Sequence, residues 1–200
     1  IEQALSDQGS VAAGIENYEF TQQDLVEAMR RIAERNELIE ADVVFLTADY
    51  DGGLPLIAQL LPEAGIDPEL VQYVGLSQWD VLPSAFHLPG IQGGWFAMPS
   101  PTRAEQFRDR FQSVYGNAPH PLAAIAYDGV AAVGASVATG NRDALNSKGL
   151  TLTGGFQGAA GIFRLRNNGT IERGLAVATI EGNQVVVLDE APRTFSNFGF

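Results

Sequence analysis

The sequence predicts an α/β fold: a Rossmann-like lobe in which helices flank a mainly parallel sheet, with a β-hairpin region at its C-terminal end. Two patterns lead to this prediction. Up to residue 115, short apolar runs alternate with segments of helical periodicity, as in βαβ units. From residue 154 onward, apolar runs flank an Asn-Gly pair and then the turn-forming residues 181–184, which indicates two successive hairpins. Their strands are predicted at residues 162–166, 171–180 and 185–188.

Four apolar runs predict the strands of the parallel sheet. The run at residues 41–47 is almost continuously apolar, as expected where helices cover both faces of a parallel strand. The other three runs are shorter and bounded by polar or turn-forming residues. In chain order, the predicted strands are residues 11–15, 41–47, 71–76 and 94–98.

Helices are predicted between and after these strands. Thr21 and Asp24 resemble a capping box and predict a helix start, whereas Gly116 is a typical helix end. The predicted helices are residues 1–7, a helix beginning at Thr21, and residues 54–61, 102–115 and 121–139.

The last predicted helix, residues 121–139, is rich in Ala, Gly and Ser. Such small side chains let a neighbouring element approach closely, so we expect this helix to pack against protein. No other predicted element is left over to cover it. We therefore expect its apolar face to be covered by a second copy of the chain or by a further part of the same protein.

Composition excludes several classes of function. The 200 residues are 46% apolar and carry a formal charge of −12 with only 12 Lys and Arg, which argues against nucleic acid as a partner. No apolar run approaches the roughly 20 residues that span a bilayer. The absence of cysteine excludes disulfides and cysteine-ligated zinc, and is compatible with both cytosol and periplasm. Because the chain begins inside a predicted helix, we expect further residues upstream.

Catalytic and metal-binding patterns are missing from the sequence. His87 and His120 lack the spacing of metal ligands, and no serine stands in a nucleophile motif. Residues 49–53 resemble a calcium loop, but Leu54 and Leu60 occupy the positions that require Gly and Glu. These observations predict neither a cofactor nor a metal and indicate that the protein is not an enzyme; the alternative is an α/β enzyme using Asp49 and His87.

Candidate ligand-binding residues lie where predicted strands end, because doubly wound sheets bind ligands outside the carboxyl ends of their strands. Three strand ends can be identified, at residues 16–18, 47–50 and 77–80. The alternative for these residues is ordinary loop polarity with a surface tyrosine. Of the two tryptophans, Trp79 is the better candidate for a cleft or an interface, and Trp95 for the core. The candidates are Thr47, Asp49, Tyr50, Ser77, Gln78 and Trp79.

The order of several motifs carries a resemblance to a known family. These motifs are residues 41–46, 74–75 with Trp79, 94–97, 111–116 with Pro119, 126–129, and 156–158 through 168–169. Together they resemble the type I periplasmic binding protein superfamily, in particular its branched-chain amino acid receptor branch. Residues 161–165, 172–177 and 191–195 are similar to the bacterial penicillin-binding protein activators, which are lipoproteins with the same fold.

The resemblance implies two lobes joined by three crossovers, with a ligand cleft between them. It assigns residues 1–118 and 160–200 to the second lobe, and residues 119–159 to a helical segment that returns to the first lobe. The Gly-rich residues 154–158 would form a crossover hinge. Amino acid receptors carry an aromatic side chain and an acid at the strand ends that correspond to residues 46–47 and 76–78. Here the acid is replaced by a neutral residue, unless Asp49 substitutes for it.

The resemblance also implies the function. It indicates a non-catalytic periplasmic protein, anchored by lipid when complete, that resembles a penicillin-binding protein activator and has a peptidoglycan synthase as its partner. The alternative is the substrate-binding component of an ABC transporter, which delivers amino acids or related small polar solutes to a permease. Self-association through the helix at residues 121–139 is a further expectation.

Overall fold

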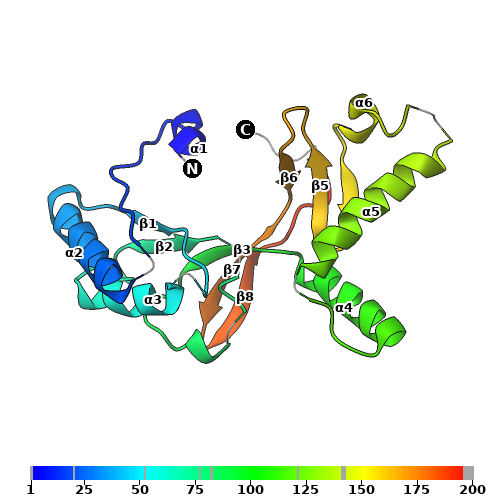
Figure 1. Cartoon of the computed structure of the whole chain (residues 1–200). Coiled ribbons are helices and arrows are strands. Elements are labelled where there is room, and N and C mark those ends of the chain that lie inside the picture. Colours follow the sequence, from blue (N-terminus) through cyan, green and yellow to red (C-terminus); the bar gives the residue numbers. More distant parts are fainter. Residues whose placement is uncertain are drawn as a thin grey trace. The chain divides into compact units, whose positions relative to one another are not determined.

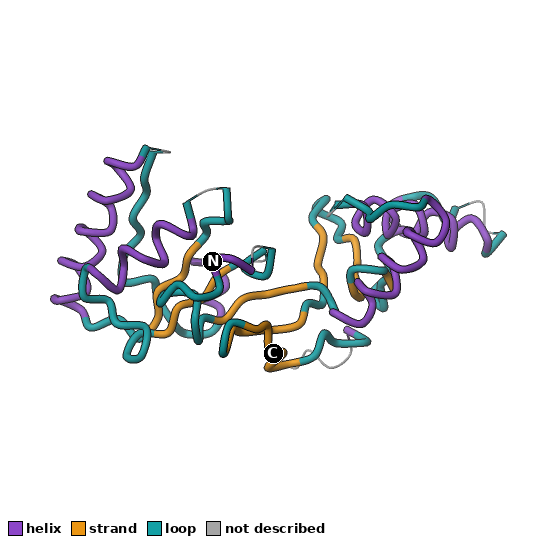
Figure 2. The backbone as a smooth tube through the Cα atoms, turned by 90° about the horizontal axis from the view of Figure 1, so that it is seen from below, coloured by secondary structure: helices purple, strands orange, loops and turns teal. Residues whose placement is uncertain are grey.

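The computed structural model describes residues 2–19, 21–51, 53–76, 78–81, 83–120, 122–140 and 143–195. It confirms the mixed α/β fold with a mainly parallel sheet and antiparallel strands (Figure 1). A five-stranded sheet has the order β1-β2-β3-β7-β8, and a three-stranded sheet has the order β4-β5-β6. Figure 2 shows the strands and helices of the same chain from below.

The helices are α1 (Glu2–Asp7), α2 (Gln22–Ile39), α3 (Leu54–Glu63), α4 (Pro101–Tyr115), α5 (Ala123–Ala138) and α6 (Ser147–Leu150). The strands are β1 (Val43–Leu46), β2 (Gln72–Gly75), β3 (Trp95–Met98), β4 (Phe156–Gly158), β5 (Gly161–Leu165), β6 (Ile171–Arg173), β7 (Ala176–Glu181) and β8 (Gln184–Asp189).

The chain divides into two compact units. The first contains residues 1–96 and 178–186, and the second contains residues 97–177 and 187–200. The chain therefore passes between the units three times, after residues 96, 177 and 186. These divisions fall at other positions than the lobe boundaries predicted at residues 118 and 159, and the predicted assignment to lobes stays a prediction.

In the first unit, β1 and β2 pair in parallel in the register Val43↔Gln72 to Leu46↔Gly75. Helices α2 and α3 pack on each other, and their buried side chains include Leu25 and Ile57. Strand β1 lies at the edge of the sheet, and two of its apolar side chains remain partly exposed, Val43 at 51% and Phe45 at 38%.

Local signals place several boundaries where they were predicted. The Thr21 hydroxyl accepts a hydrogen bond from the Asp24 amide at 3.2 Å, which caps α2. Gly116 ends α4 with a φ of 76°, in the left-handed region that glycine adopts without strain. At the tip between β7 and β8, Gly182 and Asn183 both have positive φ, as a two-residue hairpin turn requires.

Two predicted strands differ in the structure. Residues 11–15 form no strand, and Val11 and Ile15 are 86% and 56% exposed. The run Val-Ala-Ala-Gly-Ile offers little apolar area to bury in a sheet, which explains this outcome. The predicted strand 171–180 is divided at Gly174 into β6 and β7, which belong to different sheets, and the Gly174 amide donates to the Ile162 carbonyl at 2.8 Å.

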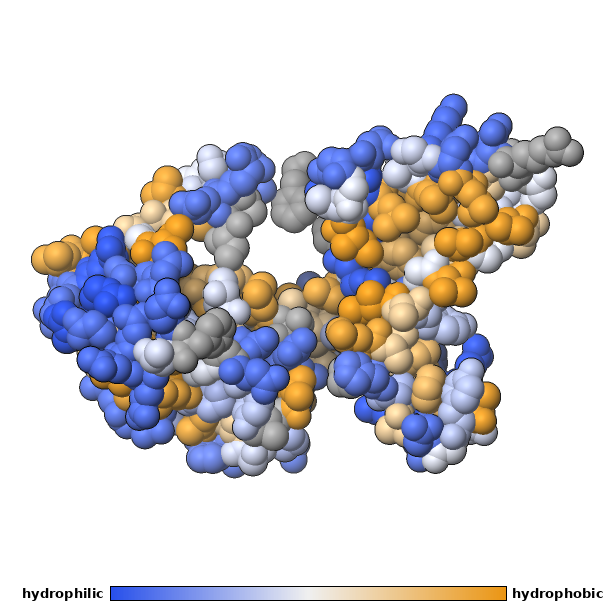
Figure 3. Space-filling view, viewed as in Figure 1, coloured by the Kyte–Doolittle hydropathy of each residue, from blue (hydrophilic) through white to orange (hydrophobic). Residues whose placement is uncertain are grey.

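Helix α5 exposes a broad apolar face. Val130 is 75% exposed and Val137 is 54% exposed, whereas Asp128, Ala132 and Ser136 are buried on the opposite side. Figure 3 shows hydrophobic residues gathered over this helix. Within the described part of the chain, none of the helices has the length and hydrophobicity needed to cross a membrane.

Candidate functional site

The candidate site lies at the carboxyl ends of β1 and β2. Because these strands are parallel, the residues that follow them emerge at the same edge of the sheet. After β1, Thr47, Asp49 and Tyr50 are exposed around the buried Ala48. After β2, Gln78 is exposed, whereas the predicted site residue Ser77 lies outside the described residues. The structure thus brings the predicted strand ends at residues 47–50 and 77–80 to one edge.

Tyr18 joins this edge from the extended segment before α2. Its side chain is half-buried, and partial burial together with the negative charge of Asp49 raises the pKa of the Tyr18 phenol. The Asp49 carboxylate therefore acts electrostatically on the Tyr18 phenol. Tyr18 was not among the candidate residues, although its position at the end of the first predicted strand was the signal that could have found it.

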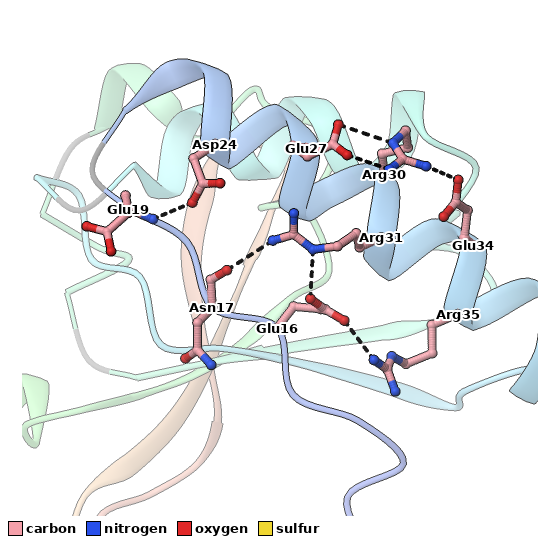
Figure 4. A network of polar contacts seen from close by, with 9 residues as sticks. All are labelled: Glu16, Asn17, Glu19, Asp24, Glu27, Arg30, Arg31, Glu34 and Arg35. Atoms are coloured by element: carbon pink, nitrogen blue, oxygen red, sulfur yellow. Dashed lines mark hydrogen bonds and ion pairs between the residues drawn. The ribbon is translucent and has the colours of Figure 1, made fainter.

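An ion-pair network fixes the segment that carries Tyr18 (Figure 4). The Glu16 carboxylate accepts from Arg31 Nε at 3.0 Å and from Arg35 Nη2 at 2.8 Å. Arg31 Nη2 also donates to the Asn17 carbonyl at 3.1 Å. Hydrogen bonds from the Arg35 and Arg31 guanidinium groups lower the pKa of Glu16. The network therefore holds residues 16–17 against α2, immediately before Tyr18.

A second contact to α2 follows Tyr18 in the sequence. The Glu19 backbone amide donates to the Asp24 carboxylate at 2.6 Å. Farther along the same helix, Arg30 pairs with Glu27 and Glu34 on the exposed surface (Figure 4). Tyr18 is thus held from both sides by contacts to α2.

Trp79 is a core residue, which corrects its prediction as a cleft or interface side chain. It is 2% exposed and stacks on Phe96 with ring centroids 6.1 Å apart. A Cβ added at Gly75 would overlap the indole, and one added at Gly94 would lie 2.5 Å from it. The two glycines therefore make the space that the ring fills.

Trp95, which was predicted in the core, is 45% exposed. Successive side chains of a strand point to opposite faces, and Phe96 and Met98 occupy the buried face of β3. Trp95 therefore faces away from the packing that holds Trp79. Single-residue hydrophobicity could not separate the two tryptophans, because the choice depends on which face of β3 is covered.

Asp80 is a second acidic group near the same strand end. Burial raises the pKa of its carboxyl group. Gln78, two residues earlier, has a φ of 84°, which is uncommon for a residue with a side chain. The turn after β2 thus combines backbone strain with a carboxyl group that is costly to ionise.

Metal-ligating side chains are not clustered in the part of the chain that the structure describes. Within that part, no cluster of three His, Cys, Asp or Glu could hold a metal ion. His87 is exposed, and His120 is exposed with its Nδ1 accepting from the Leu122 amide at 3.2 Å.

An aromatic groove in the second unit is chemically different from the strand ends. Helices α4 and α5 line it with aromatic rings that contact each other at a tilt: the Phe107 and Tyr127 centroids are 5.3 Å apart, and those of Phe111 and Tyr115 are 4.5 Å apart. Arg110 is the charged side chain among the lining residues. The groove continues the apolar character of the exposed face of α5 and offers few groups that would orient a polar ligand.

Comparisons with known proteins agree with this architecture. Residues 1–184 match the family model described as periplasmic binding protein. No curated protein matches the sequence significantly. The chain spans about half the length of solved structures that it resembles.

Three solved structures illustrate the likeness. A putative branched-chain amino acid ABC transporter from Rhodospirillum rubrum has a TM-score of 0.69 at 18% identity, over 94% of this chain and 55% of that one. An ABC transporter substrate-binding protein from Desulfitobacterium hafniense has a TM-score of 0.64 at 19% identity, over 94% and 54%. A solute-binding protein from R. palustris, in complex with 4-hydroxybenzoate, has a TM-score of 0.63 at 15% identity, over 96% and 54%. The sequence match over residues 1–184, together with this fold, shows that the chain belongs to the periplasmic binding protein family.

Proposed function

We propose that the protein is a non-catalytic, extracytoplasmic solute-binding protein whose ligand contacts the carboxyl edge of β1 and β2. The observation that carries this proposal is the meeting of Tyr18 and Asp49 at that edge, with Thr47, Tyr50 and Gln78 exposed around them. Two phenols, a hydroxyl, an amide and a carboxylate form a polar surface with hydrogen-bonding groups of both kinds. The match to a family of binding proteins supports the same conclusion.

The charge of this edge limits the ligand. Asp49 supplies a carboxylate that would attract an ammonium group or accept hydrogen bonds from hydroxyls. The aromatic rings of Tyr18 and Tyr50 would cover apolar parts of the same molecule. We therefore propose a small solute that carries an amino group or several hydroxyls, such as an amino acid. Binding would shift an equilibrium between open and closed arrangements of two lobes.

Calorimetry on the full-length protein with a panel of amino acids and small polyols tests this proposal. A ligand that binds at micromolar affinity should bind about tenfold or more weakly to Asp49→Asn, because a charged hydrogen bond contributes about 1.5–3 kcal/mol. Asp51→Asn is the matched control, since Asp51 is an exposed acid two residues away. Equal losses in both variants would contradict a specific role for Asp49, and a panel without any binder would contradict the solute-binding function.

A second candidate is a penicillin-binding protein activator that regulates peptidoglycan synthesis. It is favoured by the similarity of residues 161–165, 172–177 and 191–195 to those lipoproteins. The partner would then be a peptidoglycan synthase instead of an ABC permease, and the complete protein would be anchored by lipid. Co-purification of the full-length protein with one partner and not the other distinguishes the candidates, and binding to neither contradicts both.

We further propose that the exposed apolar face of α5 is covered by a part of the protein beyond these 200 residues. The exposure of Val130 and Val137 supports this, as does the roughly twofold greater length of the solved relatives. Light scattering tests it. In the full-length protein, Val130→Asp should lower stability without changing the oligomeric state. If the variant instead dissolves a dimer, a second copy covers α5.

A further inference from the structure

The hairpin of β5 and β6 ends in an exposed turn that carries a chemically labile dipeptide (Figure 1). Asn168 is followed by Gly169 in this turn, and these two residues are the single Asn-Gly pair in the 200 residues. Residues 166–170 are all exposed. Gly169 has a φ of 82°, and a Cβ added to it would have no neighbour within 4 Å. Water therefore has access to both residues of the pair.

The Asn168 side chain folds over the residue that follows it. Its Oδ1 accepts from the Thr170 backbone amide at 3.0 Å and from the Thr170 hydroxyl at 2.7 Å. The first of these hydrogen bonds closes a ring of atoms that contains both the Asn168 Cγ and the Gly169 backbone nitrogen. An electrophilic carbon and a nitrogen that can attack it thus belong to one small ring.

An asparagine in this arrangement reacts with its own backbone. The Gly169 nitrogen loses its proton to water and forms a bond to the Asn168 Cγ. The bond from Cγ to Nδ2 then breaks, and Nδ2 takes a proton from water and leaves as ammonia. Water opens the resulting cyclic imide at either of its carbonyl groups, which leaves aspartate or isoaspartate at position 168. The net reaction consumes water, releases ammonia and needs no oxidant or reductant.

Two neighbours favour this reaction. Gly169 has no side chain to hinder the approach of its nitrogen to Cγ. Negative charge develops on the Asn168 Oδ1 as the nitrogen attacks, and two donors of Thr170 already bind that oxygen. The hydrogen bond from the Gly169 amide to the Arg166 carbonyl, at 3.0 Å, opposes the attack. It lies in an exposed turn, where local opening costs little free energy.

We propose that Asn168 is a site of spontaneous deamidation, and that the Thr170 hydroxyl promotes the reaction by stabilising the charge on Oδ1. The product has a structural consequence. The length of the turn fixes the register of a hairpin, and isoaspartate adds a methylene group to the backbone between the paired residues Leu165 and Ile171. The modified hairpin therefore holds β6 less firmly against β5.

Peptide mapping of the aged, folded full-length protein tests the site. Trypsin releases residues 167–173, and fragmentation in the mass spectrometer assigns the modification to Asn168. The protein is incubated in mildly alkaline buffer until half of a synthetic peptide of residues 164–173 has deamidated. Asn183 is the internal control, because it lies in the exposed turn between β7 and β8 but precedes Gln184 instead of glycine. Conversion at Asn168 should exceed conversion at Asn183 about tenfold or more.

Three variants test the roles of the side chains. Thr170→Val keeps the backbone donor and removes the hydroxyl, so conversion at Asn168 should slow about threefold or more. Thr170→Ser keeps a hydroxyl and should retain the wild-type rate. Asn168→Gln has a longer side chain that forms the cyclic imide far more slowly. This variant should keep its unfolding temperature during the incubation, whereas the unfolding temperature of the wild type falls.

Each measurement has an outcome that contradicts the proposal. Conversion at Asn168 no greater than at Asn183 overturns the deamidation site. A wild-type rate in folded Thr170→Val overturns the role of the hydroxyl, and an unchanged unfolding temperature of the modified protein overturns the effect on the hairpin. If a variant fails to fold by circular dichroism, the comparison of the two asparagines in the wild type still decides the site. No readout needs a ligand, so failure of solute binding is a separate outcome.

Discussion

Asp128 and Arg173 form a buried ion pair, with Arg173 Nη1 2.7 Å from Asp128 Oδ2; the Asp128 side chain is 0% exposed and the Arg173 side chain 14%. Asp128 also accepts from the amides of Ala159 and Ala160, at the turn between β4 and β5. The Arg173 guanidinium lies 4.8 Å from the centroid of the Phe163 ring. One carboxylate thus joins α5, the β4–β5 turn and β6, which are far apart in the sequence.

Removing this carboxylate should strongly destabilise the second unit. Asp128→Ala leaves the Arg173 charge and two backbone amides without their partner, and breaking a buried pair costs about 3–5 kcal/mol. Urea unfolding followed by circular dichroism measures the loss. Asp109→Ala, an exposed acid on α4, is the control and should change stability by about 0.5 kcal/mol or less. A similar loss in both variants would contradict the central position of Asp128.

Gly75 should tolerate no side chain. In Gly75→Ala the new Cβ overlaps the Trp79 indole, so the ring must move, at a cost of about 1–3 kcal/mol. Tryptophan fluorescence should shift to the red as the indole meets water, and the unfolding midpoint in urea should fall. Gly129→Ala on α5 is the matched control. A Cβ there has no neighbour within 4 Å, and replacing a helical glycine by alanine should stabilise by about 0.5–1 kcal/mol.

Glu16 should make the protein sensitive to acid. Its pKa in the folded protein lies below the ordinary value of 4.5, so its contribution to stability is present above that value and disappears as the pH falls through the folded pKa. Thermal unfolding between pH 3 and pH 7, values chosen to bracket about 4.5, should show a weaker acid dependence in Glu16→Gln than in wild type. Glu37→Gln, an exposed acid on α2, should retain the wild-type slope. Parallel curves for all three proteins would refute the role of Arg31 and Arg35.

Asp80 should change stability with pH in the direction opposite to Glu16. Burial raises its folded pKa above 3.8, so the folded state binds the proton more tightly and ionisation of Asp80 opposes folding. Stability from this group increases as the pH falls through the folded pKa and levels off below about 3.8. Asp80→Asn should therefore unfold at a higher temperature than wild type at pH 7, a neutral condition well above about 3.8, and the difference should shrink in acid. A lower melting temperature for Asp80→Asn at neutral pH would disprove this.

The parts of the fold that local chemistry determines could be predicted from the sequence. Thr21 caps α2, Gly116 ends α4, and the Asn168-Gly169 pair forms the turn between β5 and β6, because each depends on a few neighbouring residues. The predicted strand at residues 11–15 was wrong, since a strand also needs a neighbour and enough apolar area to bury. The division at Gly174 likewise depends on contacts with residues distant in the sequence, Ile162 and Pro192.

The position of the candidate site could be predicted from the sequence, but the burial and the electrostatic interactions of its side chains could not. The order of strands indicated that residues 47–50 and 77–80 emerge at the ends of parallel strands, and the pairing of β1 with β2 agrees with that. The burial of Trp79 depends on the absence of side chains at Gly75 and Gly94, which no local pattern reveals. The influence of Asp49 on Tyr18 arises because the Glu16 network holds an otherwise irregular segment against α2.

The edge position of β1 has a practical consequence for handling these 200 residues by themselves. Its sequence Val-Val-Phe-Leu is apolar on both faces, and Val43 and Phe45 are partly exposed beside a row of backbone groups that face no strand within the described sheet. Such an edge is a template on which other chains can add as strands. Concentrated solutions of this segment should therefore form β-rich aggregates, and a lysine at position 43 or 45 should keep the segment in solution for longer.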